Sequence, residues 1–468
     1  MNNSPLHDLS RRKFIGACCA GVGLTGMLSA LAQLRVIGAL ADPENAPPPA
    51  PGILPPSSDY KALVCLFLAG GNDANNLLVP YDPTSYAAYA AARGTLALGR
   101  DTLLPLKARN PDGRTLALHA AVPELRELFE GGHLAMLANV GTLVVPTTKE
   151  QFKAKTVPLP GQLFSHNDQQ VQWQSSVPDR MFTSGWGGRL ADLTRTLNES
   201  NRISMSISLA GQNSFQVGRE VVQFAVSPNG AVQPSGTGGN IGAIRARTSS
   251  GLMHPGDENL LSAAFAGLTT DAVTDSALLA TVLGKDAPFT TAFPKSNLGQ
   301  QMRMIARMIA AAPALGLKRQ IFFARIGGWD LHDGEITAHA KLLADVSASV
   351  AAFHKATTEL NLADQVTTFT ASDFGRTYTG NGDGSDHGWG SHHMIIGGAV
   401  KGGDVYGAMP DLTVNGPDDT GRGRWIPTTS VDEYSATLAK WFGVSATDLP
   451  TVLPNIGRFA KPDLGFMG

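Results

Sequence analysis

Carboxylate and imidazole side chains follow three short apolar runs of this sequence. Each run is succeeded within a few residues by its candidate metal ligands: residues 62–68 by Asp73, residues 320–326 by Asp330 and His332, and residues 365–370 by Asp373. Short β-branched runs closed by glycine and aspartate predict buried strands of a parallel sheet. Because ligands of open α/β sheets bind beyond the carboxyl ends of such strands, we expect these side chains to meet at one edge. Carboxylates and imidazoles brought together there indicate a divalent metal site.

The first candidate ligand, Asp73, follows the glycine pair Gly70 and Gly71, which lets the backbone turn sharply and approach a ligand closely. An Asx-turn is the structural alternative, because aspartate is common in turns. Asp330 and His332 lie two residues apart, so in an extended segment both side chains point to the same side and can face one ion. The alternative for His332 is a turn histidine that hydrogen-bonds to the backbone.

Two residues are candidates for catalysis rather than metal binding. Arg376 lies just after Asp373, and a planar guanidinium beside a metal suits an oxyanion such as phosphate or sulfate. The alternative is a structural ion pair between Arg376 and Asp373. Ser165 precedes His166, and a serine that faces a metal can act as a nucleophile because the ion lowers its pKa.

Histidines are concentrated in the motif segments. Five of the 11 lie there: His166, His332, His387, His392 and His393. His387 follows Asp386 within a glycine-rich run and is a candidate ligand. His392 and His393 point to opposite sides of an expected strand, so at most one of them faces the site. We favour His392 as the ligand and interpret His393 as a packed, hydrogen-bonded residue.

The elements that must position these residues alternate in type along the chain. Strands are predicted at residues 62–68, 134–140, 320–326, 365–370 and 393–397, and helices at residues 86–93, 121–130, 298–312, 336–360 and 431–442. Residues 201–226 alternate like β-structure, and residues 227–258, rich in Gly, Ser and Pro, predict a flexible insertion. The order of strands and helices predicts one α/β domain at residues 59–468.

The N-terminus is typical of an export signal. Residues 10–15 carry a twin-arginine pattern, followed by an apolar stretch rich in Gly and Ala and an A-x-A cleavage signal at residues 39–41. The pattern predicts a signal peptide at residues 1–41, a mature chain that begins at Asp42, and export to the periplasm or the medium by the twin-arginine pathway.

A transmembrane anchor is the alternative reading of the same stretch. Gln33 and Arg35 interrupt its apolar character, so we expect cleavage and no stable membrane anchor afterwards. The Pro-rich residues 42–58 predict an extended linker to the folded domain.

Composition narrows the classes of protein that remain. A chain of 468 residues can bury a large core. A formal net charge of −2 gives no reason to expect nucleic acid binding, which normally requires a basic patch. Cys18 and Cys19 leave with the signal, so Cys65 is expected to be an inert core residue, and the mature chain has no thiolate-rich metal cluster.

The motifs taken in order resemble a known family. They are Gly-Gly-Asn-Asp after the first strand, Ser-His before a Gln-rich stretch, Gly-Trp-Asp-x-His, Ser-Asp-Phe-Gly-Arg-Thr and Asp-His-Gly-Trp-Gly, behind a twin-arginine signal. Across residues 60–460 this pattern resembles the bacterial domain-of-unknown-function family 1501, which is similar in turn to the alkaline phosphatase and sulfatase superfamily. The resemblance implies an alkaline-phosphatase-like three-layer α/β sandwich, with a mostly parallel central sheet, helices on both faces and two metals.

The resemblance also implies roles for individual residues. They are Asp73 as the first-strand ligand of one metal, Asp330 and His332 as ligands of the other, Ser165 as the nucleophile, Asp373 as the late aspartate and His387 as the last histidine. Two departures stand out. Leu331 alone separates Asp330 from His332, where the superfamily spaces the pair more widely, and Phe374 stands where a histidine usually follows the late aspartate. These departures indicate that one metal binds weakly or not at all.

The leading hypothesis is therefore an exported metal-dependent hydrolase of phosphate or sulfate esters. It would use one or two divalent ions of Zn, Mn, Ca or Mg, act on a small anionic ester, and employ Ser165 for attack and Arg376 to hold the anion. The alternative is a non-catalytic periplasmic binding or assembly protein with a protein partner, in which a degenerate site holds an ion for structure. Phe374 favours this alternative.

Overall fold

The computed structural model describes residues 59–109, 113–200, 202–230, 260–284 and 286–468. The predicted signal peptide at 1–41, the linker at 42–58 and all but residues 227–230 of the predicted insertion lie outside the described residues. The chain divides into two compact units, residues 1–47 with 233–275 and residues 48–232 with 276–468. The described part of the first unit is residues 260–275 of helix α8 (Leu260–Leu283), and everything below concerns the second unit. Among the helices described, none combines the length and apolar character that crossing a membrane requires.

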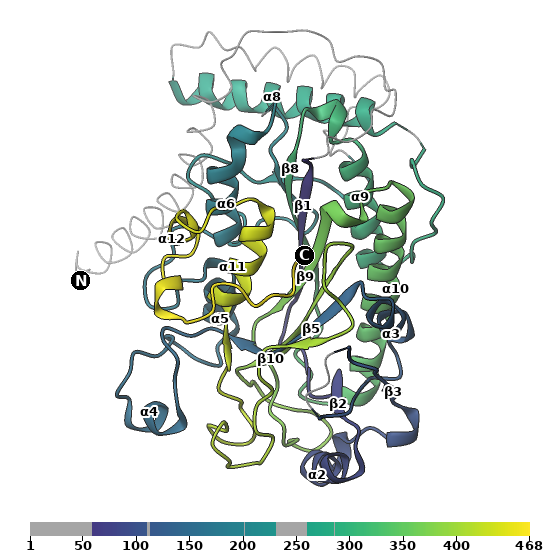
Figure 1. Cartoon of the computed structure of the whole chain (residues 1–468). Helices are drawn as coiled ribbons and strands as arrows, with labels where there is room; N and C mark the ends of the chain where they lie inside the picture. The colour runs from purple at the N-terminus through teal and green to yellow at the C-terminus, as the bar shows by residue number, and fades with distance from the viewer. Residues whose placement is uncertain (1–58, 110–112, 201, 231–259, 285) are drawn as a thin grey trace, which may run out of the picture. The chain divides into compact units, whose positions relative to one another are not determined.

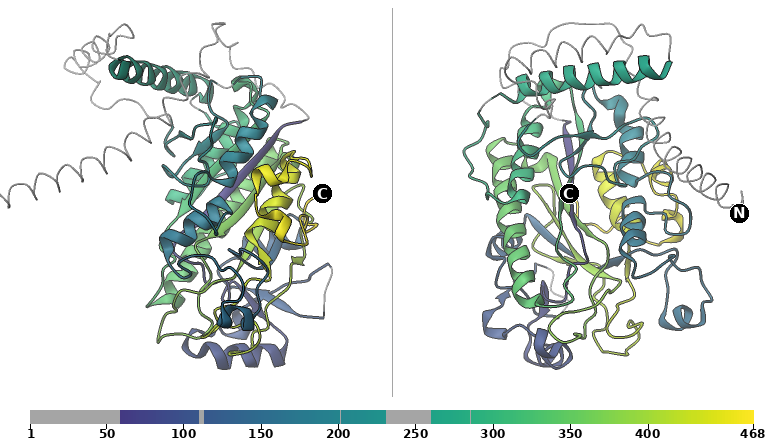
Figure 2. Two further views of the ribbon diagram at one scale, coloured as in Figure 1. Left: turned by 90° about the vertical axis from the view of Figure 1, so that its left-hand side faces the viewer. Right: turned by 180° about the vertical axis from the view of Figure 1, so that it is seen from behind.

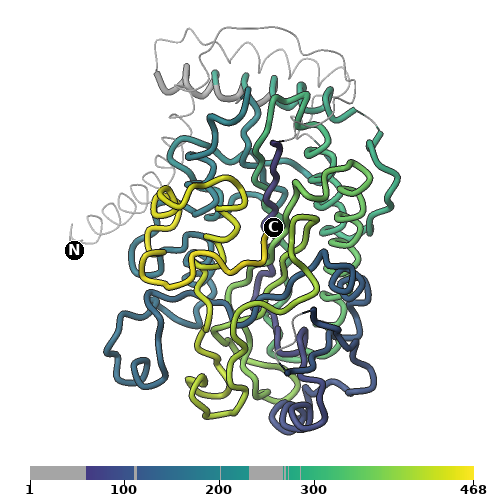
Figure 3. The backbone as a smooth tube through the Cα atoms, in the orientation of Figure 1, coloured from purple at the N-terminus to yellow at the C-terminus, as the bar shows by residue number. Residues whose placement is uncertain are grey.

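One large sheet organises the second unit. Its strands in spatial order are β11 (Val405–Tyr406), β5 (Leu134–Gly141), β10 (Ser391–Gly397), β9 (Val366–Ser372), β1 (Lys61–Leu68), β8 (Arg319–Ile326), β6 (Ser206–Ser208) and β7 (Phe224–Ala225), and β12 (Thr429–Ser430) also pairs with β5. Strand β1 therefore lies between two strands from the last third of the chain. Figure 3 shows this purple segment running between green ones.

Strand direction brings the predicted ligands to one edge. Strands β9, β1, β8, β6 and β7 pair in parallel, and β10 pairs antiparallel with both β9 and β5. The carboxyl ends of β1, β8 and β9 consequently share one edge, where their following loops gather toward the lower part of Figure 1. Because β10 runs in the opposite direction, its amino-terminal end lies at that same edge.

Helices cover both faces of the sheet (Figures 1 and 2). One face carries α3 (Pro123–Glu130), α9 (Asn297–Ala310) and α10 (Glu335–Glu359), and the other carries α5 (His166–Ser175), α6 (Trp186–Thr194), α11 (Val431–Phe442) and α12 (Leu449–Val452). The prediction of a three-layer α/β sandwich with a mostly parallel sheet is confirmed. Its physical reason is the near-continuous apolar character of the central strands, which must be shielded from water on both faces.

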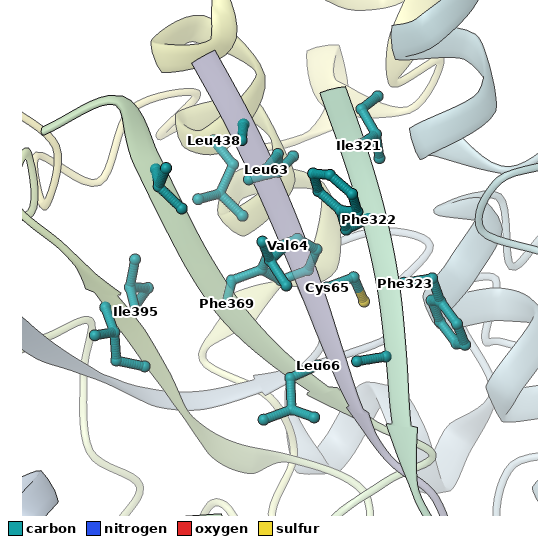
Figure 4. Packing of buried hydrophobic residues seen from close by; sticks show 14 of the residues in the cluster. Leu63, Val64, Cys65, Leu66, Ile321, Phe322, Phe323, Phe369, Ile395 and Leu438 are labelled. Atoms are coloured by element: carbon teal, nitrogen blue, oxygen red, sulfur yellow. The ribbon is translucent and has the colours of Figure 1, made fainter. Parts of the chain in front are cut away.

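The core lies against these central strands. In β1 every residue after Lys61 is buried, and Figure 4 shows Leu63, Val64 and Leu66 packing among side chains of the neighbouring strands. Phe67 stacks on Phe323 of β8 with ring centroids 6.1 Å apart. Cys65 is a free, buried cysteine, and burial raises the pKa of its thiol, so the predicted inert core role fits its surroundings.

A small antiparallel sheet lies beside the strand ends. It consists of β2 (Leu78–Pro80), β4 (Leu116–Leu118) and β3 (Leu104–Pro105), next to helix α2 (Pro83–Arg93). Asp82 caps α2 by accepting a hydrogen bond from the Ser85 N–H, 2.9 Å away. A short separate helix, α4 (Lys149–Ala154), begins at a capping box formed by Thr148 and Gln151.

The alternating pattern at residues 201–226 produces little strand. Only the short β6 and β7 form there, because polar side chains capture the backbone between them. The Gln216 amide donates to the carbonyls of Ile207 and Ile321, both at 3.0 Å, and Asn213 and Gln216 bond to each other. These side-chain bonds engage backbone groups that a longer parallel pairing of β6 and β7 would need.

Candidate metal centre

Glycine at the end of β1 lets two strand-end loops touch. Gly70 has a φ of +125°, and a Cβ there would lie 2.4 Å from the backbone nitrogen of Asp330. The Gly70 N–H also donates to Asp373 Oδ1 at 3.0 Å. The loops after β1, β8 and β9 are therefore packed directly on one another, which only glycine permits at this position.

Three imidazole nitrogens converge on the carboxylate of Asp330. His332 Nε2 lies 3.0 Å and His387 Nε2 lies 3.1 Å from Asp330 Oδ1, and His166 Nε2 lies 3.3 Å from Oδ2. The Nε2 atoms of His332 and His387 are 3.1 Å apart. We call His166, Asp330, His332 and His387 the His–Asp cluster.

The other nitrogen of each ring is held from outside the cluster. His166 Nδ1 donates to Asp373 Oδ2 at 2.7 Å, His387 Nδ1 donates to the Phe164 carbonyl at 2.7 Å, and His332 Nδ1 faces Asp386 Oδ1 at 3.3 Å. Since carboxylates and carbonyls only accept, each Nδ1 carries the proton. With the Nδ1 proton held by these acceptors, the Nε2 atom of each ring is turned toward Asp330 and can offer its lone pair to a cation, as metal-binding histidines normally do.

The spacing of the ligand atoms suits a small divalent ion. Metal–nitrogen bonds of about 2.0–2.1 Å in a tetrahedral site place ligand atoms roughly 3.3 Å apart. The cluster's contacts of 3.0–3.3 Å match this value. Within the described part of the chain, His166 Nε2 is also buried without a hydrogen bond. The residues present therefore fit a divalent metal bound by His166, Asp330 and His387, whose ligand atoms all lie within 4.8 Å of one another, with His332 in contact with two of these ligands.

Charges around the cluster favour an ionised Asp330 and a neutral His387. Burial pushes the pKa of Asp330 upward, but the hydrogen bond and charge of Arg376 outweigh it, so this pKa lies below its ordinary value. Burial lowers the pKa of His387, which keeps the ring available as a lone-pair donor. The hydrogen bond to Asp373 raises the pKa of His166.

Arg376 contacts the cluster from the protein interior, where its side chain is only 1% exposed. Its buried guanidinium donates to Asp330 Oδ1 at 2.7 Å, to the Gly70 carbonyl at 3.2 Å, and to both the Oγ and the carbonyl of Ser385. The alternative of a structural Arg–Asp pair is realised, with Asp330 as the partner in place of Asp373. These bonds orient the carboxylate of Asp330. They leave Arg376 little capacity to hold a substrate anion, which is the role that the sequence predicts for it.

Asp73 lies outside the His–Asp cluster. Its carboxylate forms a buried ion pair with Arg93 of α2 and accepts from Asn75 Nδ2 at 3.2 Å. Burial pushes the pKa of Asp73 upward, but the charge of Arg93 and several hydrogen bonds outweigh it and lower this pKa. The contact with Arg93 could not be foreseen from turn chemistry, because it depends on where α2 docks.

Asp373 is fully engaged in orienting other groups. Its Oδ1 accepts from Gly70, and its Oδ2 accepts from His166 and from Gln170 Nε2 at 2.8 Å. The sequence predicts Asp373 as a metal ligand. In the structure it is instead a hydrogen-bond partner of His166, and it favours the tautomer of that ring with the proton on Nδ1.

Ser165 and His392 also have partners outside the cluster. Ser165 Oγ donates to Asp168 Oδ2 at 2.6 Å. His392 is buried in β10, its Nδ1 accepts from the Asn139 N–H at 3.0 Å, and burial lowers its pKa to about 4. His393 packs on Trp173 with ring centroids 4.7 Å apart, which agrees with the packed role predicted for it.

His166 is a candidate ligand that the sequence analysis does not single out, because it assigns the chemical role in the Ser-His pair to Ser165. The signal that could have indicated His166 is its position as the first residue of helix α5, where a side chain lies next to the preceding loop. Phe164, which holds the ring of His387 through its carbonyl, has a φ of +73°, a conformation that costs a non-glycine residue about 1–3 kcal/mol and is concentrated at functional sites.

Comparison with known proteins gives one family match and distant structural likenesses. Residues 60–422 match the family described as "Protein of unknown function (DUF1501)". No curated protein matches. Among solved structures, "Ps i-CgsB" is 10% identical with a TM-score of 0.35, and its complex with k-i-k-neocarrahexaose is 10% identical with a TM-score of 0.33; each covers 86% of this chain and 77% of that chain.

A third solved structure, the PsFucS1 sulfatase from Pseudoalteromonas sp., is 11% identical with a TM-score of 0.33, and the match covers 84% of this chain and 69% of that chain. Likeness at this level carries no argument about the chemistry of the His–Asp cluster.

Proposed function

The chain belongs to the family described as "Protein of unknown function (DUF1501)", and from its His–Asp cluster we propose that it is an exported, metal-dependent hydrolase of phosphate or sulfate esters. The observation that carries the proposal is the convergence of three Nε2 atoms on Asp330, each ring held at Nδ1 by an outer acceptor. Solvent reaches this convergence, because the side chains of Asp330 and His332 are 43% and 45% exposed. An exposed cluster of this kind is open to a substrate as well as to an ion.

When bound, a divalent cation supplies Lewis-acid polarisation of a phosphoryl or sulfuryl oxygen. The protein's own residues fix the orientation of the side chains that would hold the cation. Arg376 fixes Asp330, while Asp373, Asp386 and the Phe164 carbonyl fix the three rings. This support keeps the ligand atoms in place without reorganisation during the reaction.

Ser165 is the proposed nucleophile. It adjoins His166 of the cluster, and its hydroxyl donates to Asp168, whose partly buried carboxylate can accept the proton as the oxygen attacks. Replacing Ser165 by alanine, or Asp168 by asparagine, should reduce ester hydrolysis while the metal content stays the same. Full activity in both variants would assign the attack to a water molecule instead.

The metal assignment is tested by elemental analysis of protein purified without chelators. We expect at least one divalent ion per chain, lost in Asp330→Asn and in His387→Ala together with hydrolysis of aryl phosphates and aryl sulfates. His133→Ala, a change at a partly buried histidine in the turn before β5, is the matched control and should retain both. A full equivalent of metal in Asp330→Asn and His387→Ala would contradict the assignment.

Export is tested by locating the protein in cell fractions. The twin-arginine pattern at residues 10–15 supports transport of a folded, metal-loaded protein. Replacing Arg11 and Arg12 by lysine should retain the protein in the cytoplasm. Unchanged export in that variant would remove the twin-arginine part of the proposal.

A second candidate function is a metal-holding binding or assembly protein of the periplasm. The engagement of Arg376 with Asp330 and the pairing of Asp73 with Arg93 favour it, because these contacts occupy an anion clamp and a ligand that a two-metal hydrolase would use. Retention of metal with no turnover on a broad panel of phosphate and sulfate esters would select this function.

A further inference from the structure

A tightly fixed loop, residues 419–424, lies beside the His–Asp cluster. The buried Asp419 holds it, because its Oδ1 accepts from the backbone nitrogens of Gly421 at 2.6 Å, Gly423 at 2.8 Å and Arg424 at 3.0 Å. Its Oδ2 accepts from the Asn415 N–H at 2.8 Å. A carboxylate that gathers this many backbone donors determines the course of the loop.

The loop keeps a left-handed backbone through three consecutive residues. Gly421, Arg422 and Gly423 have φ values of +133°, +64° and +72°. Glycine adopts these values at little cost, but an arginine does not, and such a residue persists only where the surrounding structure over-determines it. The strained position of Arg422 is therefore a feature that the Asp419 contacts maintain.

Two guanidinium groups are delivered by this loop to the outer partners of the cluster. Arg422 Nη1 forms an ion pair with Asp386 Oδ2, the residue whose other oxygen faces His332 Nδ1. Arg424 Nε donates to the His387 carbonyl at 2.7 Å. The Arg424 guanidinium also lies 4.8 Å from the centroid of the Phe164 ring.

Both guanidinium groups keep donors to spare. An arginine side chain offers five N–H donors. Among the described residues, Arg422 has a hydrogen-bond partner only at Nη1, and Arg424 only at Nε. Burial and the nearby charge of Arg422 lower the pKa of Arg424, so two like charges face each other here. The side chain of Arg422 is 44% exposed. The carboxylates of Asp386 and Asp419 offset part of this charge. The spare donors at a solvent-facing position favour an anion.

We propose that Arg422 and Arg424 form the subsite that binds the tetrahedral anion of a phosphate or sulfate ester next to the His–Asp cluster. Planar guanidinium donors match two oxygens of such a group, which a single buried and saturated arginine like Arg376 cannot do. The subsite deepens the proposed hydrolase function and rests on it for the identity of the ester. Binding of the bare anion is independent of turnover.

The test measures binding of inorganic phosphate and, separately, inorganic sulfate to the full metal-loaded chain by calorimetry. Arg422→Gln and Arg424→Gln should each weaken binding of the preferred anion roughly tenfold, the loss expected for one charged hydrogen-bonding group. Arg126→Gln, a change at an exposed arginine of α3, is the control and should bind as the unaltered protein does. Whichever anion binds more tightly identifies the ester class.

Metal content and kinetics separate this role from a structural one. Each variant should keep its metal and, on an active ester, raise KM with little change in kcat, while Arg422→Lys should recover part of the binding. Unchanged anion affinity in both glutamine variants would overturn the proposal. Loss of metal or of thermal stability in Arg422→Gln would overturn it as well, because Arg422 would then act only by supporting Asp386. If no ester is turned over but anion binding still depends on both arginines, the subsite stands and the hydrolase assignment fails.

Discussion

His166 Nδ1 lies 2.7 Å from Asp373 Oδ2, so a residue that opens helix α5 is oriented by a carboxylate at the end of strand β9. The two residues are 207 positions apart in the chain. The contact leaves His166 Nε2 free toward Asp330, 3.3 Å from that carboxylate. Asp373 thus contributes to the His–Asp cluster without belonging to it.

Replacing Asp373 by asparagine should weaken metal binding by about 10–100-fold, the usual consequence of losing an outer acceptor to a ligating histidine. The amide keeps the shape of the side chain and can still accept from Gly70, so the fold should be retained. Competition with a chromogenic chelator measures the affinity. Asp364→Asn is the control, because Asp364 is exposed and lies just before the first residue of β9, at the end far from the cluster. Equal affinity in the two variants would show that His166 needs no help from Asp373.

Replacing Gly70 by alanine should destabilise the protein by about 2–4 kcal/mol, combining backbone strain at positive φ with a steric clash. The added Cβ would lie 2.4 Å from the Asp330 nitrogen, so metal retention should fall as well. Gly327→Ala, where a Cβ meets nothing within 4 Å, is the matched control and should change stability little. Chemical denaturation measures both variants. Similar losses of stability in Gly70→Ala and Gly327→Ala would show that the close contact between Gly70 and Asp330 does not require glycine.

Glu335 should behave as a protonated side chain at neutral pH. Burial and the neighbouring Asp73 raise its pKa to about 9, and its Oε2 accepts from Ser385 Oγ at 2.6 Å. Glu335→Gln reproduces the neutral, hydrogen-bonding form and should cost less than about 1 kcal/mol. Glu335→Ala leaves the Ser385 hydroxyl without its acceptor and removes one of the two carboxylates beside Arg93, so it should cost about 2–4 kcal/mol. Urea denaturation near pH 7 distinguishes the two. A glutamine variant as unstable as the alanine variant would show that the charged carboxylate is needed.

Asp432 in the first turn of α11 should make stability depend on pH. Burial raises its pKa to about 7, so between about pH 4 and pH 7 the folded protein binds this proton more tightly than the unfolded chain does. Its contribution to stability is therefore full below about pH 4 and is lost as the pH rises toward 7. Each unit of pKa shift corresponds to about 1.4 kcal/mol.

The comparison of Asp432→Asn with the unaltered protein isolates this residue, because all other titrating groups cancel. The asparagine variant should gain stability relative to the unaltered protein as the pH rises from 4 to 7, with no further gain above that range. Thermal unfolding at several pH values supplies the measurement, and Asp448→Asn, at an exposed position of the same C-terminal region, should show no such trend. A stability difference that stays constant across the range would exclude a raised pKa at Asp432.

The main elements of the fold could be predicted because their signals are local. The helix predicted at 431–442 is observed as Val431–Phe442, and the three apolar runs form β1, β8 and β9. Burial on both faces of a parallel sheet requires continuous apolar strands, and that requirement is visible in the residue order. The alternation at residues 201–226 misled for the converse reason, since side-chain bonds such as those of Gln216 compete with strand pairing without any local signature.

For the site, the sequence by itself determined which residue types stand at the strand ends, and it brought Asp330, His332 and His387 to the same edge. Only the tertiary structure decided that His166 joins them, that Arg376 bonds to Asp330, and that Asp73 pairs with Arg93. The physical reason is that strand-end geometry follows from the chain's own periodicity. The choice of partner among several nearby charges depends on strand order and helix docking, even where the partners are only 46 residues apart, as for Arg376 and Asp330, or 20, as for Asp73 and Arg93.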